Sequence, residues 1–594
     1  MTPLQSLLLL SCAGSTLAQL TPSATYSPPS ASAGLTSSTS TPNAQWSNIL
    51  GNSLYFYDAQ RSGKLDQGAY GNRVEWRNDS ALEDGSDWNL DLTGGWYDAG
   101  DYIKATFPLT FTLFAISWGA LTHGHGYDLA QQTAYLDGTL RWGYDWLIKA
   151  HPSDNTLFVQ VGSGDVDNAY WGGDQDIPTP RPGYPVNSSF PGTDAWSSAA
   201  AAFAIGSVLY TPSVSYNPTS SSAPPESIGN STYAATLLSH ARTLYAAANN
   251  TTPRQTYYES LGESVAAYAS SNWNDDLTLA ALTLALATNE SSYYADAYNY
   301  YVQYKISGLQ EVWNWDSAIP AIYVMFAEIA TARPELATGA GLSTNLTGWQ
   351  AETENYFDKI LDGNFKRGYL TKGGLLYFDG DSDEASLNPA MAIAMLMFKY
   401  APLASSSSKT ESYTNFAQSQ LNYLLGNNPM NVPYIVGQHP NSPQNPHSAP
   451  ASGGTDIKAI RTSPPTEAYV LYGAVVGGPL SDDRFWDWRD DWAQTEVALD
   501  YNAMLPTLAS MQLLNNTADP HYVSVQAGTY SIPSGQPCDA ALPCEGGGGL
   551  SGGAKAGIAI GVILGVLLIV AAICYWKRKS LARTWRKGYR RPTV

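Results

Sequence analysis

Two carboxylates that could act on one water molecule stand three residues apart in this chain of 594 residues. Asp98 and Asp101 lie in residues 94–105, GGWYDAGDYIKA, among glycines and aromatic side chains that could face a flat apolar substrate. Because glycine adopts backbone conformations closed to other residues, we predict a shaped loop that leads into a helix. The two acids can also be interpreted as a purely structural feature, an aspartate N-cap followed by a second acid in the first helical turn.

A second stretch of acids and aromatic side chains lies almost 400 residues further on. Residues 485–503, FWDWRDDWAQTEVALDYNA, contain Asp487 and Glu496. Two such stretches in one chain without repeats indicate a carboxylate-lined cleft of the kind that hydrolyses glycosidic bonds. The 39 Tyr and 18 Trp residues suit the flat faces of sugar rings, but they suit a large core equally well.

The elements that must position these acids are predicted to be helices, because apolar residues recur every three or four positions from Trp46 to about Asn515. Strand-like alternation is nearly absent, so the predicted fold class is all-α with long loops. The residues alone do not fix how the helices are arranged. Helices are expected over 46–60, 108–120, 129–147, 194–210, 232–248, 274–288, 315–331, 384–401, 411–425 and 493–514, with weaker ones near 256, 291 and 347.

The N-terminal region has the features of a secreted protein. Residues 1–18 are predicted to be a signal peptide, although its first residues lack Lys and Arg. Residues 19–45 are rich in Ser, Thr and Pro and are expected to be disordered or O-glycosylated. Potential N-glycosylation sites agree with this compartment and are Asn78, Asn187, Asn230, Asn249, Asn250, Asn289, Asn345 and Asn515.

The C-terminal region is predicted to anchor the protein in a membrane. A stalk, 517–555, contains Cys538 and Cys544, which are the expected disulfide partners because the other two cysteines lie in the signal peptide and at the membrane edge. Residues 556–576 carry no charge and can span a bilayer as one transmembrane helix. The basic tail, 577–594, contains no acid, which indicates a single-pass type I protein with its large region outside the cell. A glycolipid-anchor signal, the alternative, would lack such a tail.

The charge of the large region limits its ligands. Without the eight basic residues of the tail, 23 Lys and Arg face 51 Asp and Glu. This acidic balance argues against nucleic acid and polyanions as partners and favours a neutral substrate.

With these residues in view, the chain resembles family 9 of the glycoside hydrolases, the secreted and membrane-bound endoglucanases, and in particular a membrane-anchored fungal type. The resemblance extends from Trp46 to about Asn515 and predicts a catalytic domain over 46–516. Its motifs occur in the family's order and are FYDAQRSGKL at 56–65, NRVEWR at 72–77, the loop at 94–105, FPGTD at 190–194, WD at 315–316 and QLNYLLGNNP at 420–429.

The resemblance implies an (α/α)6 barrel and hydrolysis of β-1,4-glucan with inversion of configuration. It assigns Asp101 as the catalytic base, Asp98 as its helper, Glu496 as the general acid and Asp487 as a further acid. It implies a β-glucan substrate, no cofactor, no metal and no obligate protein partner. The substrate-binding residues that it implies are His447, Trp96, Tyr97, Trp171, Asp194, Trp315 and Tyr501.

Two loops depart from the family pattern. Where the family has Pro-His-His-Arg, this chain has Pro446-His447-Ser448-Ala449, so affinity, pH optimum or substrate choice is expected to differ. Asn168 stands where His is usual, beside a group of acids that could bind calcium but lack the spacing of an EF-hand. These acids are Asp165, Asp167, Asp174 and Asp176.

Two alternative functions remain open from the sequence. One is a glucanase for a mixed-linkage or substituted β-glucan, including the cell wall of the organism itself. The other is a non-catalytic surface protein that binds glycans. The retained Asp98, Asp101 and Glu496 count against the second, because a binding protein needs no acid and base.

Overall fold

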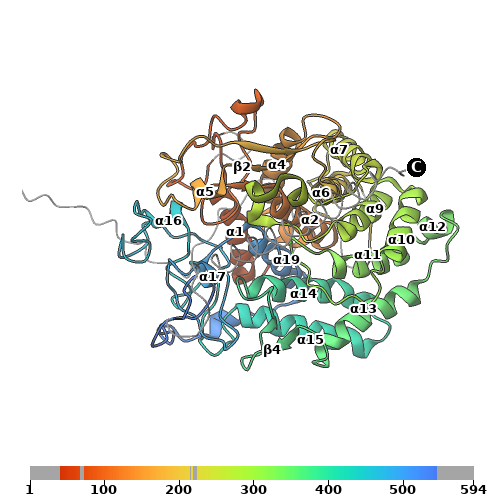
Figure 1. Cartoon of the computed structure of the whole chain (residues 1–594). Helices are drawn as coiled ribbons and strands as arrows, with labels where there is room; N and C mark the ends of the chain where they lie inside the picture. Colours follow the sequence, from red (N-terminus) through yellow and green to blue (C-terminus); the bar gives the residue numbers. More distant parts are fainter. Residues whose placement is uncertain (1–40, 67–71, 214–215, 219–223, 545–594) are drawn as a thin grey trace, which may run out of the picture. The chain divides into compact units, whose positions relative to one another are not determined.

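A computed structural model describes residues 41–66, 72–213, 216–218 and 224–544 (Figure 1). The predicted signal peptide, transmembrane helix and basic tail lie outside these residues, and none of the described helices is long and apolar enough to cross a membrane. Both described cysteines, Cys538 and Cys544, are disulfide-bonded. Apart from Pro543 and Cys544, the described residues belong to one compact unit that extends to Leu542.

Six helices with apolar residues around their whole circumference form the centre of this unit. Every residue of α2 is buried, as expected for a helix enclosed on all sides. In the order α2, α6, α9, α11, α14 and α19, each packs on the next, and α19 packs back on α2, which closes a ring. The inner helices are α2 (Thr106–His123), α6 (Thr193–Tyr210), α9 (Asn274–Thr288), α11 (Ile319–Ala332), α14 (Leu387–Tyr400) and α19 (Leu505–Asn515).

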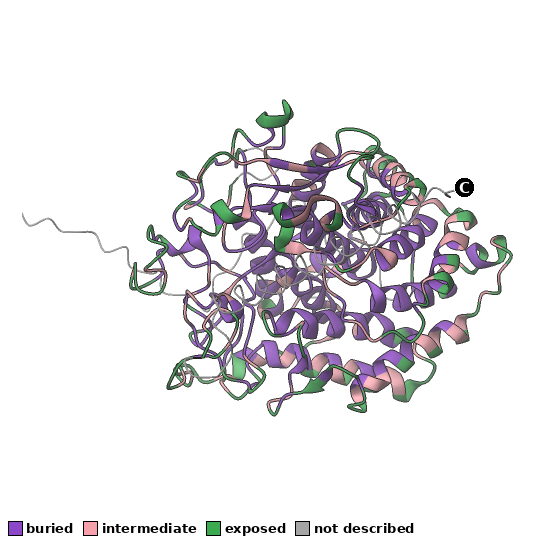
Figure 2. Cartoon of the chain, in the orientation of Figure 1, coloured by how far each residue is buried: buried purple, intermediate pink, exposed green. Residues whose placement is uncertain are grey.

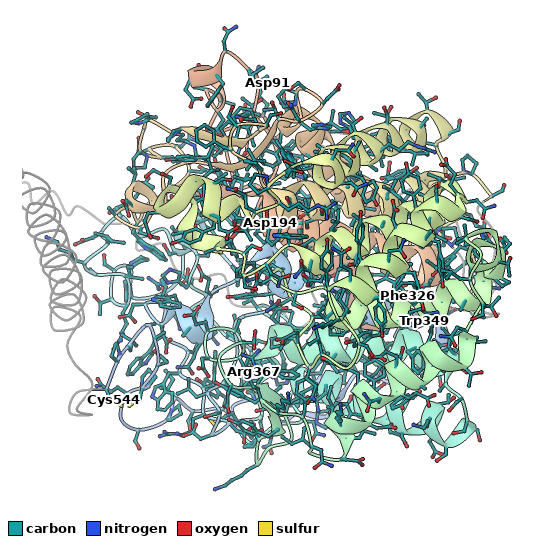
Figure 3. The ribbon with its side chains drawn as sticks, turned by 45° about the vertical axis from the view of Figure 1, so that its right-hand side comes forward. Asp91, Asp194, Phe326, Trp349, Arg367 and Cys544 are labelled. Atoms are coloured by element: carbon teal, nitrogen blue, oxygen red, sulfur yellow. The ribbon has the colours of Figure 1, made fainter. Side chains whose placement is uncertain are left out.

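Six outer helices cover the inner ring, and each packs chiefly on one inner partner. Five of them bury a single face, so exposed residues follow their outer sides in Figure 2, whereas α1 is buried on all sides from Asn48 to Ala59. Phe326 of α11 and Trp349 of α13, for example, stack with ring centroids 4.0 Å apart (Figure 3). From the partner of α2 onward, the outer helices are α4 (Thr133–Ala150), α7 (Ser231–Asn250), α10 (Ser291–Gln303), α13 (Leu346–Leu361), α15 (Ser407–Leu424) and α1 (Ala44–Ala59). This arrangement is consistent with the expected (α/α)6 barrel.

Short elements complete the described fold. The strands form a three-stranded antiparallel sheet of β1 (Lys104–Ala105), β2 (Leu157–Val161) and β3 (Gly183–Val186), and a hairpin of β4 (Gly368–Leu370) and β5 (Leu376–Phe378). The short α-helices are α3 (His125–Leu129), α5 (Gly164–Asp167), α8 (Tyr257–Leu261), α12 (Pro334–Gly339), α16 (Ala449–Ser452), α17 (Trp492–Thr495) and α18 (Leu499–Asn502). The 3-10 helices are η1 (Ser86–Trp88), η2 (Gly262–Tyr268), η3 (Ala401–Leu403) and η4 (His521–Ser524). The all-α prediction therefore holds for the bulk of the fold, and strands this short leave no alternation in the sequence.

The predicted helix over 493–514 is wrong as one continuous element, because the structure divides it into α17, α18 and α19. Glu496 has an extended backbone with φ −64° and ψ 150°, and its carbonyl oxygen accepts a hydrogen bond from Gly477 N at 2.9 Å. At Glu496, this backbone hydrogen bond to the loop of Gly477 takes the place of a hydrogen bond within a helix. Pro506 lies in the first turn of α19, where the missing N–H has no cost.

The N-terminal ends of several inner helices meet at one end of the ring. Asp275, at the start of α9, accepts a hydrogen bond from Ala318 N at the start of α11, at 2.7 Å. Asn388, in the first turn of α14, donates to Asp500 of α18 at 2.8 Å. The loops that precede α2, α9 and α19 therefore lie together at this end of the ring. Both acidic stretches are in these loops.

Candidate active site

Asp98 is buried in the loop that leads into α2, with 1% of its surface exposed. Its Oδ2 accepts a hydrogen bond from the hydroxyl of Tyr268, while Oδ1 has no protein partner. The Asp98 amide donates to Ile103 O at 2.9 Å, which closes the loop. Burial raises the pKa of Asp98 well above its ordinary value, and nearby carboxylates add to this against the lowering effect of Tyr268.

Asp101 lies at the partly exposed tip of the same loop. Burial raises the pKa of Asp101, and the carboxylates of Asp167, Glu496 and Asp98 raise it further. Asp167 is fixed by the amides of Tyr102 and Ile103, which donate to its Oδ2 at 3.0 and 2.8 Å. Four carboxyl groups thus share one region, and their mutual repulsion prevents all four from being ionised together.

Glu496 comes from the second acidic stretch and is partly exposed. Burial raises its pKa to about 8, with smaller contributions from Asp500 and Glu384, while a hydrogen bond from the Gly100 amide acts in the opposite direction. A carboxyl group with this pKa is protonated at neutral and mildly acidic pH. It can therefore donate a proton to a leaving group.

Backbone hydrogen bonds join the two acidic stretches, which are remote in sequence. Leu499 N donates to Asp98 O at 2.9 Å, and Ala449 N donates to Gly100 O at 2.7 Å. His447 N donates to Thr495 O at 2.9 Å. The main chain thus fixes the loop of Asp98 and Asp101 against that of Glu496, and the predicted convergence of the two stretches is confirmed.

Two residues in this region were not among those predicted. Asp500 is fully buried, and burial raises its pKa to about 7. Its position in the apolar run VALDYNA could have indicated a functional residue. An acid among residues that fill a core must be hydrogen-bonded or protonated there. Tyr268, which donates to Asp98, has no signal in its neighbouring sequence, because the fold brings it across 170 residues.

Asp487 has a different position from that expected of a catalytic acid. Its carboxylate accepts hydrogen bonds from the amides of Gln444 and Asn445 at 2.8 and 3.0 Å, and from Asn445 Nδ2 at 3.1 Å. Both oxygens are therefore engaged with the loop that precedes His447. In this structure Asp487 holds that loop in place, which corrects the prediction that it serves as a further acid.

Three predicted substrate-binding residues border the carboxylates. The Nδ1 of His447 donates to Arg489 O at 2.7 Å, and burial lowers the pKa of its ring to about 4, so the imidazole is neutral. Trp315 is half-buried and packs edge-on against Tyr268, with ring centroids 5.1 Å apart. Tyr501 is half-buried beside Asp500, whose charge contributes, after burial, to its raised pKa.

Four other predicted substrate-binding residues are buried, so the structure contradicts a direct contact with sugar. Trp96 is 0% exposed and packs on Tyr57, and the hydroxyl of Tyr97 (1% exposed) bonds to Ser80 Oγ at 2.9 Å. Trp171 (3% exposed) supports the ring of His447, with centroids 4.8 Å apart. Asp194, labelled in Figure 3, is 0% exposed at the start of α6. These buried side chains support the loops that carry the site acids.

Two of the four acids that raised the question of calcium bind other groups. Asp174 forms an ion pair with Arg77 at 2.8 Å, and Asp167 accepts the amides of the 102–103 segment. Among the described residues, no group of three or more His, Cys, Asp or Glu side chains is placed to hold a metal ion.

The altered loop at Ser448 and Ala449 is also buried. Ala449 begins α16, is 0% exposed and packs with Tyr97, Tyr102 and Trp171. A long charged side chain has no space at this position in the observed backbone conformation. The departure from the family pattern therefore lies within a buried aromatic cluster.

Several known proteins are similar to this chain in sequence. Endoglucanase A from Bacillus pumilus is 34% identical over 462 residues, which cover 77% of this chain and 64% of that protein. Endoglucanase 13 from Arabidopsis thaliana is 33% identical over 480 residues, covering 77% of this chain and 91% of that protein.

Solved structures give the same result. The endoglucanase from the termite Nasutitermes takasagoensis is 33% identical, with a TM-score of 0.68 over 79% of this chain and 98% of that one. Endoglucanase CelQ from Clostridium thermocellum, solved in complex with cellotriose, is 27% identical, with a TM-score of 0.64 over 79% of this chain and 70% of that one. The model of the family described as glycosyl hydrolase family 9 matches residues 46–509. The chain therefore belongs to glycosyl hydrolase family 9.

Proposed function

We propose that this protein is an endo-β-1,4-glucanase that hydrolyses internal bonds of cellulose or a related β-glucan with inversion of configuration. The observation that carries the proposal is the backbone connection between the Asp98/Asp101 loop and Glu496, because it fixes a candidate base and a candidate acid in one site. The relatives are named endoglucanases, and CelQ binds cellotriose, a β-1,4-linked fragment.

In the proposed mechanism, Asp101 is the group of this cluster that is ionised while Glu496 keeps its proton, so it can remove a proton from the attacking water while Asp98 holds that water by a second acceptor oxygen. Two acceptors fix the direction of attack on the anomeric carbon. Glu496, protonated because of its burial, donates its proton to the departing glycosidic oxygen. One displacement at the anomeric carbon inverts its configuration.

The remaining residues position these groups or bind sugar. Tyr268 orients the carboxylate of Asp98, and Asp487 holds the loop of His447. His447, Trp315 and Tyr501 are the proposed contacts to the substrate. Half-buried aromatic rings such as Trp315 and Tyr501 suit the C–H faces of a pyranose.

A panel of polysaccharides tests this function. The full chain, purified in detergent, should release reducing ends from a soluble β-1,4-glucan and rapidly lower its viscosity, which distinguishes internal from terminal cleavage. Asp101→Ala serves as the inactive control against contaminating hydrolases. Binding of glucan without release of sugar by the wild-type protein would indicate a non-catalytic glycan-binding protein instead.

The altered loop favours one alternative within the same chemistry. Because Ser448 and Ala449 replace the family's His and Arg, the preferred substrate can be a mixed-linkage or substituted β-glucan. The same panel decides this, since such a substrate would then give a higher kcat/KM than unsubstituted β-1,4-glucan.

We also propose that the enzyme acts at the outer cell surface as a single-pass type I protein. The uncharged run at 556–576 and the basic tail that follows support this topology. Protease added to intact cells should remove the catalytic region but spare an epitope placed after Val594. Digestion of the epitope with protection of the catalytic region would contradict the orientation.

A further inference from the structure

A cavity of about 390 Å³ lies on the outer side of α4, and the carboxylates of the active site do not line it. Residues 93–95 form one wall, and side chains of α4 together with Lys64 form the rest. Its volume lies in the range of small-ligand sites. Gly95 in its wall is three residues from Asp98 in the sequence, but Asp98, Asp101 and Glu496 do not line the cavity, so it is distinct from the active site.

The walls of the cavity suit a sugar ring. The indole of Trp142 is fixed, because its Nε1 donates to Gly95 O at 2.8 Å and the guanidinium of Arg61 lies 4.5 Å from its ring centroid. Gly94 has φ +88° and borders open space, since an added Cβ would meet no atom within 4 Å. At Gly95 an added Cβ would lie 2.5 Å from the Trp146 ring. Rigid aromatic and glycine surfaces of this kind accept the flat C–H face of a pyranose.

The charge of the cavity is opposite to that of the chain. Lys64, Arg141 and Lys149 line it together with one acid, Asp145, whereas the whole chain has a formal net charge of −20. Lys149 is engaged by Asp91 at 2.9 Å, so Lys64 and Arg141 are the cations that can receive a ligand. Lys64 is exposed, and within the described part of the chain it has no ion-pair partner. Arg141 pairs with Asp137 in a partly exposed salt bridge, which costs little to rearrange. A local cationic site on an acidic protein attracts a carboxylate.

We propose that this cavity is a second carbohydrate site that binds a uronic acid, with the pyranose ring on Trp142 and the carboxylate at Lys64 and Arg141. The overall acidic charge excludes long polyanions, but a single carboxylate beside a sugar ring matches both the aromatic wall and the cationic rim. The uronic acid can be free or can be a side group of a larger polysaccharide. This site goes beyond the proposed glucanase function and does not depend on it, because binding requires no hydrolysis.

Titration calorimetry on the full-length protein tests the site, with glucuronic acid, a glucan trisaccharide that bears one glucuronic acid, and glucose as probes. Both uronates should bind and glucose should not. A uronate that binds only when attached to the glucan would identify the side group as the source. Binding should persist with saturating cellotriose, since the active site is separate, and it should weaken in high salt.

We predict opposite changes in the Kd of glucuronic acid for two variants. Lys64→Gln should weaken binding about tenfold through loss of a charge-assisted hydrogen bond. Asp145→Asn should tighten binding, because it removes the only acid of the rim and keeps an oxygen for the Tyr233 hydroxyl, which donates to Asp145 at 2.7 Å. Lys366→Gln, at an exposed lysine outside the cavity, is the matched control and should change nothing. The proposal is wrong if Lys64→Gln behaves like the control, or if cellotriose displaces the uronate.

Discussion

At the scale of single residues, Asp500 affects the pKa of Glu496, the proposed proton donor. Its buried carboxylate, held by Asn388 Nδ2 at 2.8 Å, is one of the charges that raise the pKa of Glu496 after burial itself. The same charge raises the pKa of Asp98. Asp500 is thus a positioning residue that acts through the groups that we propose to react.

We predict that Asp500→Asn shifts the basic limb of the pH profile of kcat/KM to lower pH, by about one pH unit, because Asp500, with a pKa raised to about 7, is charged in the pH range where Glu496 loses its proton. Removal of a negative neighbour makes ionisation of Glu496 easier, so the proton donor is lost at a lower pH. The amide keeps the hydrogen bond from Asn388 and therefore separates charge from structure. A lower kcat with unmoved limbs would show that Asp500 has only a structural role.

Ala449 is a second residue at which the structure changes the expectation. Restoration of the family's Arg there would appear to add a sugar contact, but the position is buried among aromatic rings. We predict that Ala449→Arg lowers the free energy of unfolding by more than about 3 kcal/mol, because it overpacks the cluster and buries an unpaired charge. Urea denaturation measures this, with Ala235→Arg on the exposed face of α7 as the control. Equal stability of the two variants would show that this loop can open.

Which side chains face the substrate could be predicted from the sequence only in part. The two acidic stretches were sufficient to predict that Asp98, Asp101 and Glu496 come together, whereas their roles rest on the family resemblance and stay a prediction. The sequence does not reveal which faces of Trp96 and Tyr97 are covered, because burial depends on elements such as α4 that are remote in the chain. An aromatic residue beside a site acid can therefore either contact the substrate or support the loop. Trp96 and Tyr97 support the loop.

At the scale of elements, the starts of the inner helices are tied to one another by buried acids. Asp194 Oδ1, at the start of α6, accepts hydrogen bonds from Ala195 N at 2.8 Å and from Tyr257 N, the first residue of α8, at 2.9 Å. It thereby connects two segments that are 63 residues apart. This contact explains the acid in the FPGTD motif without any contact to substrate.

We predict that Asp194→Ala destabilises the fold by about 2 to 4 kcal/mol, since two buried amides lose their acceptor. Asp194→Asn, which retains one acceptor oxygen, should cost less. Thermal unfolding compares the two variants with the wild-type protein, and kcat/KM measured well below the transition should stay within a few-fold of wild type. A loss of activity without a loss of stability would restore Asp194 as a substrate contact.

Most helices could be predicted from their periodicity, and the inner and outer sets differ in the sequence by the width of their apolar faces. The exception, residues 493–514, shows the limit of this approach. The run is apolar and regular, yet Glu496 is extended because its backbone pairs with the loops of His447 and Gly477. Periodicity reports which residues are buried, whereas long-range backbone pairing decides where a helix breaks.

At the scale of the whole molecule, the described domain buries many acids whose pKa values are raised by burial. Protonation stabilises the folded state at such groups, because the folded pKa exceeds that of the unfolded chain. Their contribution is fully present below about pH 4 and is lost as the pH rises through the folded values. The groups and their raised pKa values are Asp275 at about 6, Asp194 and Asp500 at about 7, and Glu496 and Asp491 at about 8.

We predict that the Tm of the protein falls by a few degrees between pH 6.5 and pH 8. Calorimetry at constant ionic strength measures this change. Two opposite effects end below this window. Acids with lowered pKa values, such as Asp84 beside Lys104 and Arg181, act at acidic pH, and buried histidines such as His123 and His447, whose pKa values burial lowers to about 3 and about 4, add stability only up to about pH 6.5. A Tm that rises or stays constant from pH 6.5 to pH 8 would show that the buried acids are not protonated in the folded state.

The most direct test of the account compares two variants on two substrates. Asp101→Ala should abolish hydrolysis of both a cello-oligosaccharide and an aryl cellobioside with a good leaving group, because neither is attacked without an activated water. Glu496→Gln should slow the oligosaccharide by about 10² to 10⁴ but leave the aryl cellobioside within about tenfold of wild type, since a phenolate departs without a proton. Equal losses on both substrates for Glu496→Gln would contradict the assignment of the acid and, with it, the proposed division of labour in the site.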